Sequence, residues 1–101
     1  MKTEKVWFAV VGIKPLKGNT TISDASGAHV NVACISDTKA NFKNKLQENF
    51  EYYKFEIFEI LDIETEENLT INNKNNSGKI KLLYEIKEGY RFAWGTFYTF
   101  P

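Results

Sequence analysis

The chain has 101 residues, in which 13 Lys and Arg balance 13 Asp and Glu, and it contains one His and one Cys. That length predicts a single domain, because domains cluster near ~100–150 residues. A hydrophobic fraction of 43% and an aromatic fraction of 15% exclude an intrinsically disordered chain. The zero net charge gives no overall field that would attract the protein to nucleic acid or to an anionic membrane.

Two strands are predicted at the start of the chain. Residues 6–13 are β-branched and aromatic, with apolar side chains on both faces, which indicates a central strand covered on both sides or covered by a partner. Residues 15–27 form a turn-rich connection. Residues 28–35 alternate with period two, which indicates a half-buried strand. On that strand Cys34 is expected in the core and His29 on the opposite face, so we do not expect a catalytic pair between them.

A helix and a third strand are predicted next. The helix covers about residues 38–50, because apolar side chains recur there at positions i, i+4 and i+8. These side chains are Phe42, Leu46 and Phe50. Residues 55–63 are dense in β-formers and predict a strand. One long helix over residues 39–64 is the alternative, since no Gly or Pro interrupts it; the aromatic residues at 52–55 favour helix followed by strand.

The last third of the chain leaves one element open. Residues 64–78 are polar and Asn-rich and predict a long loop. Residues 79–87 fit either a strand or a short helix, and residues 90–100 predict a final strand with a bulge at Gly95. Either choice predicts one α+β domain over residues 1–101, with a mostly antiparallel sheet and one or two helices on one face. A ferredoxin-like arrangement is one candidate.

The residue types of several kinds of active site are missing from the sequence. One His and one Cys cannot supply the three or four ligands of a zinc site, and one Cys cannot form an intramolecular disulfide. The nucleophile-elbow, phosphate-loop and dinucleotide-binding fingerprints are absent. A carboxylate pair for acid–base catalysis stays open as a minor alternative, because Asp and Glu are plentiful. We therefore expect no catalytic residues, no metal site and no cofactor.

The charge is unevenly distributed along the chain. Eight of the 13 acidic residues fall within residues 48–67, where only Lys54 opposes them, so this segment carries about −7. An acidic surface of this kind steers a basic partner by complementary potential, and tyrosines beside the acids make good interface anchors. Its alternative role is solubility and protection of a sheet edge. The candidate partner-binding residues are Glu48, Glu51, Tyr52, Tyr53, Asp62, Glu64, Glu66 and Glu67.

Nucleic acid and membrane are not expected partners. Proteins that stack single-stranded bases place aromatic side chains beside a basic groove, and the basic residues here do not cluster with the aromatic ones. The longest apolar stretch, residues 6–13, is far shorter than the ~20 residues that cross a bilayer, and no small-residue cleavage site follows it. We therefore expect a soluble, cytoplasmic protein.

Three stretches give the chain a resemblance to a group of bacterial proteins. They are Trp7-Phe8-Ala9-Val10 in the first strand, the helix leading into residues 55–63, and the closing Trp94-Gly95-Thr96-Phe97-Tyr98-Thr99-Phe100. In outline the chain resembles small α+β immunity proteins of contact-dependent growth inhibition and related polymorphic toxin systems. The resemblance implies a cytoplasmic, non-catalytic protein that binds a cognate toxin tightly and blocks its active site. Many such toxins are basic nucleases, and the acidic segment would suit one.

Two functions of different classes follow from these features. The first is an immunity protein that neutralises a cognate bacterial toxin, whose basic active-site cleft would bind the acidic surface. The second is a regulatory domain of ferredoxin-like shape that binds a small ligand between sheet and loop. The sequence leaves the oligomeric state open.

Overall fold

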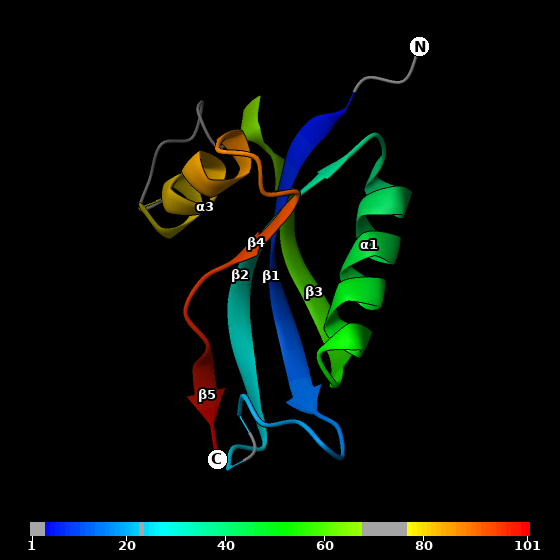
Figure 1. Ribbon diagram of the computed structural model, residues 1–101, viewed down its shortest axis with the longest axis vertical. Coiled ribbons are helices and arrows are strands. Elements are labelled where there is room, and N and C mark those ends of the chain that lie inside the picture. The colour runs from blue at the N-terminus through cyan, green and yellow to red at the C-terminus, as the bar shows by residue number, and fades with distance from the viewer. Residues whose placement is uncertain (1–3, 23, 68–76) are drawn as a thin grey trace.

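The computed structural model describes residues 4–22, 24–67 and 77–101 (Figure 1). Within these ranges the chain forms, in order, β1 (Lys5–Pro15), β2 (Gly27–Ser36), α1 (Lys39–Tyr52), β3 (Phe55–Thr65), α3 (Ser77–Lys87), β4 (Phe92–Trp94) and β5 (Tyr98–Phe100). The predicted α+β class and the mostly antiparallel sheet are confirmed. Residues 68–76, which make up most of the predicted Asn-rich loop, lie outside the described ranges.

The five strands form one antiparallel sheet in the order β3-β1-β2-β4, and β5 pairs with the N-terminal end of β2. β1 therefore lies between two other strands, as its apolar residues on both faces predict. A ferredoxin-like domain follows the order β-α-β-β-α-β. This chain does not adopt that order, because the described residues between β1 and β2, 16–22 and 24–26, form no helix.

Helix α1 covers one face of the sheet, which we call the α1 face. Its three predicted core residues, Phe42, Leu46 and Phe50, are completely buried. They belong to a core cluster with Val11 of β1 and Val32 of β2. The helix begins after Thr38, whose hydroxyl accepts a hydrogen bond of 3.1 Å from the backbone N–H of Asn41. The predicted helix is therefore confirmed with both its start and its buried side.

Helix α3 covers part of the opposite face, which we call the α3 face (Figure 1). Phe8 of β1 and Ala33 of β2 pack there with Leu82 and Ile86 of α3. The two helices therefore lie on opposite faces of the sheet, and not on one face as predicted. The reason is the alternation of β1, in which Phe8 is buried toward α3 while its neighbour Ala9 is buried toward α1.

The segment that the sequence left open between strand and helix is α3. Leu82 and Ile86 lie one turn apart and are buried. Ile80 and Tyr84, which complete the strand-like alternation in the sequence, are exposed. Gly89 ends the helix: its φ is +117°, and its N–H donates to the carbonyl of Ile86 at 3.1 Å.

The stretch after α1 is a strand, which confirms helix followed by strand over one long helix. The pairing of β3 with β1 shifts register twice, between Phe8 and Val10 and between Gly12 and Ile13. Asp62, near the first of these shifts, has a φ of +51°. Bulges bend and twist an edge strand, and so they disfavour pairing with another chain. The outer edge of β3 is therefore protected.

The predicted final strand is divided into two short strands. β4 ends at Trp94 and β5 begins at Tyr98. The three residues between them stand opposite two residues of β2, because Trp94 pairs with Val32 and Tyr98 with His29. This extra residue agrees with the bulge predicted at Gly95. It also directs Trp94 to the α1 face and Tyr98 to the α3 face.

We predict that Gly27→Ala lowers the free energy of unfolding by ~1–3 kcal/mol, because overpacking forces the backbone to shift. An alanine Cβ there would lie 2.6 Å from the carbonyl oxygen of Ile13 and 2.5 Å from the Phe100 ring. Urea unfolding followed by tryptophan fluorescence measures the change. Gly95→Ala is the matched control, since its Cβ would meet nothing closer than 3.9 Å. Equal unfolding midpoints for the two variants would contradict the prediction.

Candidate functional site

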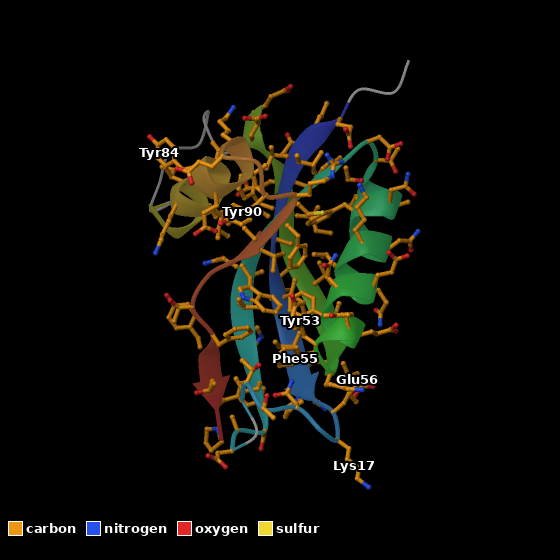
Figure 2. The ribbon with its side chains drawn as sticks, viewed as in Figure 1. Lys17, Tyr53, Phe55, Glu56, Tyr84 and Tyr90 are labelled. Carbon is orange, nitrogen blue, oxygen red and sulfur yellow. The ribbon has the colours of Figure 1, made fainter. Side chains whose placement is uncertain are left out.

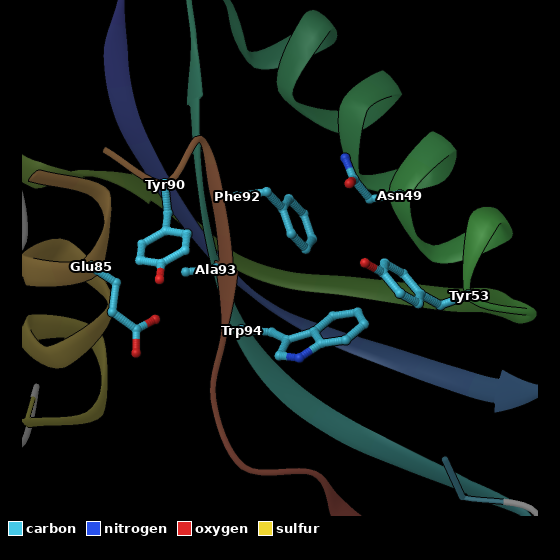
Figure 3. Close-up of a pocket in the computed structure, with 7 residues that line it drawn as sticks. All are labelled: Asn49, Tyr53, Glu85, Tyr90, Phe92, Ala93 and Trp94. Carbon is cyan, nitrogen blue, oxygen red and sulfur yellow. The ribbon is translucent and has the colours of Figure 1, made fainter. Parts of the chain in front are cut away.

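A groove of about 410 Å³ runs along β4, between the C-terminal ends of α1 and α3 (Figure 3). Its lining residues are Asn49, Tyr53, Glu85, Tyr90, Phe92, Ala93 and Trp94. Figure 3 shows Asn49 and Tyr53 reaching it from the α1 side and Glu85 from α3. Because β4 is the last strand at this end of the sheet order, the groove follows a sheet edge.

Trp94 forms the floor of the groove toward α1. Its ring centroid lies 5.4 Å from that of Phe50 and 5.0 Å from that of Tyr53. It also contacts Phe97, at 5.2 Å, and Phe55 at the start of β3, at 6.3 Å. Aromatic pairs at these separations contribute about 0.5–1.5 kcal/mol each beyond their burial. The edge strand is therefore fixed to the end of α1 and to the start of β3.

The backbone of Tyr53 is held by a residue of the loop between β1 and β2. Asn19 is buried, and its Nδ2 donates to the carbonyl oxygens of Tyr53 and Lys54, both at 3.0 Å. Its Oδ1 accepts from the backbone N–H groups of Thr21 and Ile22 at 2.9 and 3.0 Å. Nothing in the sequence marks this asparagine, because its partners lie 34 and 35 residues further along the chain.

Exposed tyrosines lie in and near the groove. All five tyrosines of the chain are exposed, with fractions between 47% and 79%. Tyr53 and Tyr90 line the groove, and the ring of Tyr52 lies 4.9 Å from that of Tyr53. In Figure 2, Tyr84, Tyr90 and Tyr53 follow one another from α3 across β4 to the end of α1. Tyrosine is enriched in protein interfaces because a large apolar ring carries a polar tip.

The lining of the groove carries one charged side chain, and it is acidic. Glu85 lies in its wall, and none of its seven lining residues is basic. Glu48 precedes the lining residue Asn49 on α1 and is exposed. The guanidinium of Arg91, next to the groove, already forms an ion pair of 2.8 Å with Glu4. The groove therefore offers the Glu85 carboxylate and several aromatic rings to a partner.

The structure divides the eight predicted partner-binding residues into two groups. Glu48, Glu51, Tyr52 and Tyr53 lie at the C-terminal end of α1. Of these four, Tyr53 lines the groove and Tyr52 contacts Tyr53. Asp62, Glu64, Glu66 and Glu67 lie toward the other end of β3. A strand of 11 residues is about 35 Å long at ~3.3 Å per residue. The acidic segment is therefore continuous in sequence but does not form one surface.

The second group also carries less unopposed charge than the sequence suggests. Glu64 forms an ion pair of 2.7 Å with Lys79, and both side chains are largely buried. Glu66 lies 3.7 Å from the ammonium of Lys87. Within the first group, Glu51 accepts a hydrogen bond of 2.8 Å from the amide of Gln47 and remains exposed.

A second hollow, of about 400 Å³, lies on the α3 side of β4. Its lining residues are Asn31, Lys81, Leu82, Glu85, Trp94, Gly95, Thr96 and Tyr98. It shares Glu85 and Trp94 with the groove. The groove therefore takes lining residues from both faces of the edge strand, and the second hollow adjoins it on the α3 face.

His29 and Glu59 form a second polar feature, on the part of the α3 face that α3 does not cover. Their Nε2 and Oε2 atoms lie 2.6 Å apart, and both side chains are 37% exposed. The His29 ring contacts Phe58 and Phe100 at 5.7 and 5.8 Å. Gly12 leaves the space that Phe58 and Glu59 occupy. No sequence pattern marks this pair, because the two residues are 30 positions apart.

The sequence placed Cys34 in the core and His29 on the opposite face, and both placements are confirmed. Burial raises the pKa of the Cys34 thiol above its ordinary value of 9.0, although Lys45 and Arg91 oppose this shift. The thiol is therefore protonated at neutral pH and is a poor nucleophile. Among the described residues, no group of three or more His, Cys, Asp and Glu side chains is placed to hold a metal ion.

Comparison with known protein families, with curated proteins and with solved structures gives no match for this chain. Neither described helix has the length and apolar character needed to cross a membrane. What the protein does is therefore inferred from its own residues.

We predict that Asn19→Ala lowers the free energy of unfolding by ~1–3 kcal/mol, because it leaves buried backbone groups without hydrogen bonds. Urea unfolding measures the loss. Asn44→Ala is the matched control, since Asn44 is exposed on α1, and its effect should stay within ~0.5 kcal/mol. If both variants unfold at the urea concentration of the parent protein, Asn19 does not hold the Tyr53 turn in place.

Proposed function

We propose that the protein is an immunity-type inhibitor, which binds a cognate protein toxin through the groove along β4 and blocks the toxin's active site. The observation that carries this proposal is the groove at an open edge of the sheet, which is lined by aromatic rings and by the Glu85 carboxylate. It combines the two features that proteins use to bind proteins, which are aromatic anchors and a charged rim.

The aromatic residues supply the binding energy in this proposal. Tyr53 is held by its ring contacts with Tyr52 and Trp94 and by the Asn19 hydrogen bond to its backbone. A side chain that is already ordered loses little entropy when a partner binds, so more of the contact energy appears as affinity. Tyr90, on the other side of β4, extends the same surface toward α3.

The acidic residues supply the selectivity. A toxin cleft that binds nucleic acid is lined by Lys and Arg, because these side chains neutralise phosphates. Glu48 and Glu85 would face such a cleft from the two sides of the groove, pair with its basic residues and exclude its substrate. Complementary charge also speeds the encounter of the two proteins.

Only part of the acidic segment predicted from the sequence is assigned to the partner-binding surface. Contact is assigned to the group at the end of α1, together with Glu85, because this group lies beside the aromatic anchors. Glu64 and Glu66 already have lysine partners at the other end of β3. These two ion pairs connect that end of β3 to α3, so we do not assign Glu64 and Glu66 to the partner-binding surface.

The test begins with capture of a stoichiometric partner from cells of the source organism, with the chain as bait and mass spectrometry to identify the partner. The captured protein is then expressed in a test bacterium, with and without this chain. We expect growth arrest by the partner alone and growth in the presence of the chain. A captured partner that does not affect growth would overturn the proposal.

The binding surface is tested with two variants of equal charge change. Glu48→Lys combined with Glu85→Lys should weaken binding of the captured partner by about 10–100-fold, because both reversals face a basic cleft. Asp62→Lys combined with Glu67→Lys is the control, since both side chains are exposed at the far end of β3, and it should leave affinity close to that of the parent protein. Isothermal titration calorimetry at low salt gives both values. If the control pair loses more affinity than the Glu48 and Glu85 pair, the partner binds at the far end of β3 and not at the groove.

A further inference from the structure

We infer that the partner is bound by strand addition: an extended segment of the partner pairs with the outer edge of β4, and its alternate side chains enter the two hollows. The identity of the partner rests on the proposed function, whereas the mode of binding rests on the geometry of β4. The segment that fits is one in which Lys or Arg alternates with apolar residues.

The backbone of β4 has unpaired groups at the correct positions. The carbonyl of Arg91 accepts from Ile35 at 3.2 Å, and the N–H of Gly95 donates to Asn31 at 2.9 Å, so residues 91 and 95 bond to β2. In an antiparallel pair these bonding residues alternate with residues whose N–H and C=O point away. Phe92 and Trp94 occupy the alternate positions, opposite Cys34 and Val32. Their backbone groups therefore point to the outer edge.

The two hollows match the alternation of an added strand. Successive side chains of a strand point to opposite faces of the sheet. The groove takes its aromatic wall from Trp94 and Tyr53 on the α1 side, and the second hollow takes Leu82 and Lys81 from α3. A strand lying along β4 would thus place one side chain toward Trp94 and the next toward α3, where Glu85 borders both hollows.

The other edge of the sheet is unsuited to strand addition. β3 has two register shifts, and Asp62 within it has a positive φ. Such bulges block edge-to-edge pairing. β4 lies between α1 and α3, and in Figure 1 it crosses in front of β2 with one helix on either side. The helices form the two walls of a slot with the edge of β4 at its base.

The chemistry of the slot selects the segment. Glu85 borders both hollows and favours a basic side chain, and Lys81 opposes this charge in the second hollow only. Tyr53, Phe92 and Trp94 favour apolar side chains in the groove. Main-chain hydrogen bonds would give affinity, and the two hollows would give specificity for alternate side chains.

The test uses a blocked hexapeptide of alternating lysine and valine as the probe and the ¹⁵N-labelled full chain as the target. At saturating peptide we expect amide hydrogen exchange of Phe92 and Trp94 to slow by about tenfold or more, because both amides gain a hydrogen bond. The amide of Ala93, which faces β2, is the internal control and should not change. Of two matched peptides, one carries N-methyl groups at the odd positions and the other at the even positions. The one whose methyl groups replace the N–H groups that face β4 should no longer slow exchange at Phe92 and Trp94.

Strand addition is overturned if millimolar peptide does not slow exchange at Phe92 and Trp94, or if both methylated peptides act like the unmodified one. It is also overturned if the slowed amides lie on the outer edge of β3. Each result is independent of the growth assay. If a captured toxin binds through Glu48 and Glu85 but the peptides do not bind, the proposed function stands and strand addition is wrong. If a peptide protects β4 but no toxin is found, strand addition stands and the proposed function is wrong.

Discussion

The packing of Trp94 is the contact on which the candidate site depends. Its indole contacts Phe50 of α1, Phe55 of β3 and Phe97 between β4 and β5, and so it connects the helix, the far edge strand and the chain's C-terminal segment. β4 has only three residues, too few to hold a sheet edge by backbone pairing alone. The aromatic cluster fixes this short strand at the edge, and the groove exists because the strand is held there.

Much of the fold was predictable because strong local patterns decide it. Phe42, Leu46 and Phe50 share one side of a helix, whereas a strand would put the polar residues Asn44 and Glu48 on that same side. The alternation of residues 28–35 indicated a strand, but α3 also buries Ala33, on the face expected to be polar. The pattern of residues 79–87 was compatible with two structures. The segment is a helix because Leu82 and Ile86, one turn apart, pack against Phe8 on the second apolar side of β1.

The site was predictable only in part. Tyr52, Tyr53 and Glu48 could be named from composition near the end of a helix, but Asn19, Glu85 and Trp94 join them only through contacts between distant parts of the chain. The expectation that the acidic residues 48–67 form one surface was wrong because it also depended on how the chain folds in space. Neighbours in sequence along an extended strand separate by ~3.3 Å per residue, so one run of acids became two groups at opposite ends of β3.

Binding of the partner at the β4 groove can be tested by hydrogen–deuterium exchange of the chain, alone and saturated with the captured partner. The groove account predicts slower exchange in peptides covering residues 49–53 and 90–95, with no change over residues 62–67. Protection confined to residues 62–67, with the groove unchanged, would contradict it.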